Sequence, residues 1–201
     1  AANQTVGSLA GLGGTVNLGT RTLTLGGLGN TSFAGNFTGT TGGLIKVGTG
    51  VQTLLGSNAL TGGVALNGGG LLLGNSGALG TGALNVAANA SLDNSIALDL
   101  TNAVNLSAGS ALTLIGSNAL TLDGDISGNG GLLKAGGASL TLNGDNSYTG
   151  PTALNAGTLV LGSDTALGVG ALNAAAGTQL DSSSALALAN TFNLSGNLTL
   201  L

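Results

Sequence analysis

The sequence predicts an all-β protein, a single-stranded parallel β-helix of about nine coils. Three observations predict this fold class. Short runs alternate leucine with small polar residues, groups of glycine and asparagine separate these runs, and a long internal repeat fills most of the 201 residues. The chain contains 40 glycines and only one proline, which suits closely stacked strands joined by tight turns.

Strand-like runs recur from one end of the chain to the other. Examples are "TLTL" at 22–25, "VQTLL" at 51–55, "LLL" at 71–73 and "TLVL" at 158–161. A period of two places the leucines on one face of a strand and the polar residues on the other. We find no segment with a sustained 3.6-residue period, so the sequence predicts essentially no helix.

The segments between these runs are rich in Gly-Asn, Gly-Ser and Gly-Gly pairs. Such residues tolerate the backbone conformations of tight turns, and they therefore mark the corners of the coils. The only proline, Pro151, follows Gly150 at an expected turn. Asparagine side chains are also expected to stack from coil to coil as amide ladders.

The internal repeat has an offset of 88 positions. Residues 43–107 align with residues 131–195 without a gap, and more than half of the positions are identical. A unit of this length suggests four coils of about 22 residues, each with about three short strands that pair in parallel between coils. On this division Leu159 and Leu161 would point into the same column as Leu71 and Leu73.

Composition excludes several classes of function. Mean hydropathy is +0.48 and net charge only −4, which argues against disorder. Arg21, Lys46 and Lys134 are the only cations, too few for a nucleic-acid surface, and no apolar run approaches the length of a membrane-spanning helix. The absence of cysteine excludes disulfides, thiol catalysis and cysteine-based metal sites.

One stretch resembles a known family. Residues 130–162, "GGLLKAGGASLTLNGDNSYTGPTALNAGTLVLG", resemble the β-strand repeat of autotransporter passenger domains, the type V secreted proteins of Gram-negative bacteria. Residues 42–74 resemble the same repeat less closely, with Leu60 at the position of Tyr148 and Gly70 at the position of Thr158. Through the internal repeat, the resemblance covers most of the chain.

The resemblance implies a right-handed β-helix that is displayed on, or shed from, the Gram-negative cell surface. It also implies a parent protein with a C-terminal outer-membrane barrel, which is expected as a partner of this segment. We therefore expect residues 1–201 to form a single β-helical segment of a longer solenoid. The lack of cysteine agrees with export of an unfolded chain through a narrow pore.

The acid and base groups are few. Histidine and glutamate are absent, which excludes histidine-dependent nucleophilic catalysis and leaves seven aspartates. Asp123 and Asp125 lie two residues apart, so in an extended chain both would point to one side, about 7 Å apart. Such a pair suits glycoside hydrolysis or a calcium site, but Asp-Gly is also ordinary turn chemistry. We favour the turn.

Five further residues recur in the repeat or stand out by type. Asp93 and Asp181 are equivalent in the two copies and mark either a repeated ligand site or a repeated turn, of which we favour the turn. Lys46 and Lys134 are also equivalent, and we expect them to face outward and keep the surface soluble. Tyr148 is a candidate for stacking on a sugar, although we favour packing over a turn.

The sequence therefore predicts a non-enzymatic structural module for surface display: a rigid stalk, an adhesin or an extracellular matrix element. We expect no catalytic residues, cofactor or metal. Partners would be a host-cell surface, a polysaccharide or another copy of the chain, with neither nucleic acid nor direct membrane insertion. Two alternatives stay open: a carbohydrate-active enzyme that uses Asp123 and Asp125, and a fibre subunit that stacks end to end through unpaired strand edges.

Overall fold

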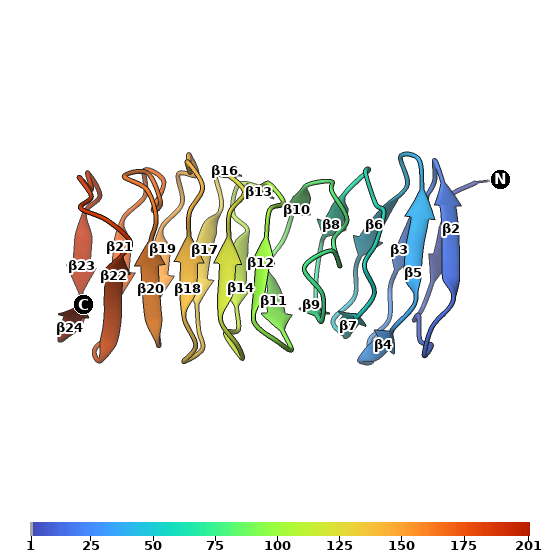
Figure 1. Ribbon diagram of the computed structural model, residues 1–201, viewed down its shortest axis with the longest axis horizontal. Helices are drawn as coiled ribbons and strands as arrows, with labels where there is room; N and C mark the ends of the chain where they lie inside the picture. Colours follow the sequence, from blue (N-terminus) through green and yellow to red (C-terminus); the bar gives the residue numbers. More distant parts are fainter. Residues whose placement is uncertain (1) are drawn as a thin grey trace.

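The computed structural model describes residues 2–201 and contains only strands, turns and connecting segments in that range. Every strand pairing within it is parallel. Figure 1 shows the coils stacked along one long axis, with the two termini at opposite ends. The predicted parallel β-solenoid is confirmed, with about 10 coils rather than nine.

Three walls run along the rod, and each contains one short strand per coil over most of its length. The first wall is a seven-stranded sheet of β1 (Gln4–Val6), β3 (Thr22–Leu25), β6 (Gly43–Lys46), β8 (Val64–Leu66), β10 (Leu84–Val86), β13 (Val104–Leu106) and β16 (Ile126–Gly128). The second wall is a nine-stranded sheet of β4 (Thr31–Phe33), β7 (Val51–Leu54), β9 (Gly70–Leu73), β11 (Ala90–Asn94), β14 (Ala111–Leu114), β17 (Gly131–Lys134), β19 (Thr152–Leu154), β21 (Leu172–Ala174) and β23 (Phe192–Leu194).

The third wall begins with the pair β2 (Thr15–Gly19) and β5 (Asn36–Gly39). It continues as a six-stranded sheet of β12 (Leu98–Leu100), β15 (Leu120–Leu122), β18 (Leu140–Leu142), β20 (Thr158–Leu161), β22 (Thr178–Ser182) and β24 (Leu198–Leu200). Residues 58–60 and 77–80 lie between these two sheets. Backbone hydrogen bonds connect them to their neighbours, for example from Ala59 N to Phe37 O at 2.9 Å and from Thr81 N to Leu60 O at 3.0 Å.

The core is a set of leucine columns inside the solenoid. Alternation along each strand sends every second residue inward, as in β20, where Leu159 and Leu161 are buried and Val160 is half-buried. Leu159 stacks between Leu140 and Leu180 of the neighbouring coils. Aliphatic side chains repeated at this spacing form a continuous apolar interior, so the core needs very few aromatic residues.

Coil length explains a correction to the predicted columns. Register partners such as Leu44 and Val64 are 20 residues apart and others, such as Leu98 and Leu120, are 22 apart, so the typical coil is shorter than the 22 residues expected. An offset of 88 positions therefore corresponds to four coils plus one further wall. Leu71 lies in β9 of the second wall, whereas its repeat equivalent Leu159 lies in β20 of the third. The prediction that they share a column is wrong.

Where a strand of the first copy has an equivalent strand in the second copy, that equivalent lies in the next wall. In the first wall lie β6, β8 and β10, whereas their equivalents in the second copy, β17, β19 and β21, lie in the second wall. In the second wall lie β7, β9 and β11, whereas their equivalents β18, β20 and β22 lie in the third wall. Because the repeat is not a whole number of coils, equivalent residues of its two copies face different directions around the rod.

Candidate functional site

Each of two buried asparagines connects three successive coils. Asn58 accepts a hydrogen bond from Phe37 N at Oδ1 (2.8 Å) and donates from Nδ2 to Ala78 O (2.6 Å). Asn146, its equivalent in the second copy, accepts from Ile126 N (2.7 Å) and donates to Ala166 O (2.7 Å). These amides replace strand hydrogen bonds where residues 58–60 and their equivalents leave regular β structure.

A second pair of asparagines repeats a different contact. Asn102 donates from Nδ2 to Gly80 O (3.0 Å) and Gly82 O (2.8 Å). Its equivalent Asn190 makes the same two bonds, to Gly168 O and Gly170 O, at the same two distances. The predicted amide ladder lies on the outside, where Asn105 donates to Asn85 Oδ1 at 2.8 Å. The repeated asparagines are therefore used to join one coil to another.

The two lysines face inward, which corrects the prediction that they face outward. Lys46 is 3% exposed and Lys134 is 1% exposed. Strand alternation places each on the same face as the leucine two residues before it, so both enter the core. Nζ of Lys46 donates to Val47 O and Gly48 O (2.6 and 3.3 Å), and Nζ of Lys134 donates to Gly136 O (2.5 Å). Burial lowers the pKa of both lysines.

Tyr148 is also an interior residue and is fully buried. Its hydroxyl lies 2.5 Å from Thr152 Oγ1, which is also buried. Burial raises the pKa of Tyr148 to about 12, while the hydrogen bond with Thr152 acts in the opposite direction. A side chain in this position cannot stack on a sugar outside the rod, so Tyr148 fills the interior where the first copy has Leu60.

The aspartates stand outside the core. Asp123 and Asp125 are both exposed, and each accepts a hydrogen bond from the next coil, from Asn143 Nδ2 (2.7 Å) and Asp145 N (2.9 Å) respectively. The structure therefore uses both carboxylates as surface connections between coils, on either side of Gly124. Within residues 2–201 no three His, Cys, Asp or Glu side chains come together as metal ligands.

The repeated aspartates do not form a repeated site or a repeated turn. Asp93 lies within β11 on the second wall and Asp181 within β22 on the third, so the expected turn is wrong at both positions. Asp93 accepts hydrogen bonds from Ser117 N (3.1 Å) and Ser117 Oγ (2.6 Å), whereas Asp181 accepts from the adjacent Ser182 N (2.8 Å). Equivalent positions of the two repeat copies thus have different structural surroundings.

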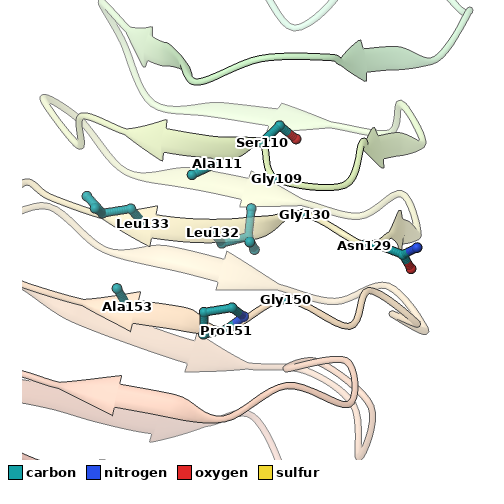
Figure 2. Close-up of a pocket in the computed structure, with 11 residues that line it drawn as sticks. Gly109, Ser110, Ala111, Asn129, Gly130, Leu132, Leu133, Gly150, Pro151 and Ala153 are labelled. Carbon is teal, nitrogen blue, oxygen red and sulfur yellow. The ribbon is translucent and has the colours of Figure 1, made fainter.

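A shallow groove of about 320 Å³ crosses the start of three strands of the second wall, β14, β17 and β19. Figure 2 shows Ala111, Leu133 and Pro151 around it, with Gly109, Gly130 and Gly150 at the corners where the strands begin. These glycines are among the residues that line the groove, and no charged residue lines it. It offers shape and apolar surface but no acid, base or cation for chemistry.

Comparison with known proteins identifies the repeat. Residues 44–73 and 132–161 each match the family described as passenger-associated-transport-repeat. No curated protein and no solved structure matched the chain. In the described range, no helix is long and apolar enough to cross a membrane.

The two matched segments contain the inward lysines and the bridging asparagines, Lys46 with Asn58 and Lys134 with Asn146. Period-two counting alone would have found the inward lysines, because Leu44 and Lys46 have the same parity. The asparagine bridges have no comparable signal, since asparagine is common throughout the chain. The resemblance seen in the sequence is confirmed: the chain carries two copies of the passenger-associated-transport repeat of autotransporter passengers.

Proposed function

We propose that this protein is a non-enzymatic passenger segment that acts as a rigid spacer outside the Gram-negative cell. The main support for the proposal comes from the contacts that the polar residues of the matched repeat make. Its distinctive polar residues, such as Lys134 and Asn146, bond to backbone groups of the solenoid rather than to a common pocket. A motif used in this way specifies a stack of coils.

The shape supports the same role. About 10 coils stacked at about 4.8 Å give a rod roughly 48 Å long. Hydrogen bonds run between coils along each wall, so the rod is stiff and each coil contacts mainly its neighbours. Folding that begins in one coil can therefore pass to the next as the chain emerges, and a folded coil cannot return through a narrow pore.

Within this proposal the passenger works at the cell surface or in the extracellular space, as a stalk, an adhesin or a matrix element. The outer walls present polar rows, such as the amide ladder from Asn85 to Asn105, to a polysaccharide, a host surface or another copy of the chain. The exposed aspartates and the uncharged groove support binding or spacing better than hydrolysis.

Export of the passenger that carries this chain tests the proposal. Asn146→Ala leaves Ile126 N and Ala166 O buried without their partner, which should destabilise two coil junctions by about 2–4 kcal/mol. Protease accessibility on intact cells should then show less folded, surface-displayed passenger at equal expression. Asn155→Ala is the matched control, since Asn155 is exposed. Equal surface levels for the two variants would contradict the proposal.

A further inference from the structure

Each inward lysine takes the place of a leucine in a column of the core. The columns read Leu25, Lys46, Leu66 on the first wall and Leu114, Lys134, Leu154 on the second. The hydrogen bonds of both ammonium groups go to backbone carbonyls and none reaches a carboxylate. A buried cation without a counter-ion lowers stability relative to leucine. Its presence at the same position of both repeat copies therefore indicates a role other than stabilisation.

The corner that receives each ammonium is closed by a glycine of the next coil. A Cβ added to Gly69 would lie 2.9 Å from Lys46 Nζ. A Cβ added to Gly157, the equivalent residue, would lie 2.7 Å from Gly136 O, which is the acceptor of Lys134 Nζ. Both glycines have positive φ, +63° and +72°, so the backbone itself favours glycine there.

Leucine columns alone specify strand register weakly. A slip of two residues between neighbouring strands keeps every inward residue inward, because side chains alternate with a period of two. In β17 and β19, such a slip would move Leu132 from its partner Thr152 to Leu154, and both of these partners are buried. A lysine differs, because a slip would replace the glycine of the next coil by a residue with a side chain above the ammonium group. The carbonyls that accept its hydrogen bonds belong to its own coil and move with it.

We propose that the lysine of one coil and the glycine of the next, Lys46 with Gly69 and Lys134 with Gly157, form a register lock. The ammonium fits only when the glycine corner of the following coil lies above it. The lock gives up some stability in exchange for a single alignment of coils that are otherwise similar. The advantage of the lock depends on the proposed function, because a passenger that folds coil by coil transmits each register error to the coils that follow.

Engineered disulfides in the purified 201-residue chain test the lock, and the natural chain has no cysteine to interfere. Leu133 and Ala153 are register partners on the outer face, so cysteines at these positions report the native alignment. Cysteines at 133 and 155 lie roughly 8 Å apart in the native register, too far for a disulfide, and become partners after a two-residue slip. Each pair is refolded from urea in a glutathione buffer.

With Lys134 present, only the 133–153 pair should cross-link above background. Lys134→Met should raise the yield of the 133–155 cross-link at least severalfold, and Lys134→Leu should do the same. Leu154→Met, a change in the same column that keeps the lysine, is the control and should leave both yields unchanged.

Two results would overturn the lock. One is an unchanged ratio of the two cross-links in both lysine variants. The other is an equal rise in the Leu154→Met control, which would indicate a generally loosened core. Because these yields are measured on isolated protein, they are independent of export, and the lock can fail while the spacer function holds.

Discussion

Truncation of one core leucine measures how strongly the columns stabilise the rod. Leu159 is 0% exposed and lies between Leu140 and Leu180, whose backbones are fixed by strand pairing. Leu159→Ala removes three carbon atoms, worth about 2.4 kcal/mol at about 0.8 kcal/mol each. The neighbouring coils cannot close the space, so a cavity term adds to this loss and the expected total is about 3 kcal/mol.

Val160→Ala is the matched control because Val160 is the next residue on the same strand but faces outward and is half-buried. It should cost less than about 1 kcal/mol. Urea unfolding followed by circular dichroism gives the global change for both variants. Hydrogen exchange of β18, β20 and β22 locates the loss, because coils stabilise only their neighbours. Equal losses for the two variants would refute the assignment of inward and outward faces.

Three further predictions concern titratable groups. Burial lowers the pKa of Lys134, so the folded state gains stability as pH rises from that lowered pKa to the ordinary value of 10.5. Lys134→Met removes the buried charge and should raise the unfolding free energy by about 1–3 kcal/mol at pH 7. The gain should be smaller at pH 10, and urea unfolding at the two pH values measures both. Tyr148, with a pKa of about 12, should show no phenolate absorbance at pH 10.5 until the chain unfolds, and its ionisation should lower stability above pH 10. Replacing both Asp123 and Asp125 by Asn should change stability by less than about 1 kcal/mol, whereas polysaccharide turnover that disappears in this double variant would contradict a non-enzymatic role.

Several features of the fold follow from local sequence. A period of two, turn residues at short intervals and a repeat longer than any supersecondary unit together predict stacked parallel strands. The inward position of Leu159 follows from the alternation in "TLVL", and the structure confirms it. The same rule predicts that Lys46 shares a face with Leu44, but its charge favoured an outward assignment. Parity decides the face here, because a strand cannot turn a single side chain around.

Other features depend on how many residues one coil contains, which no local pattern states. With coils of about 20 residues, the 88-residue repeat ends one wall beyond its starting point, so Asp93 and Asp181 face different directions. The contacts of Asn146 with the coils on either side likewise exist only after stacking. The sequence by itself determined the strands, the corners and the family of the repeat. The tertiary structure decided which residues meet, because coil length sets the partner of every residue across the rod.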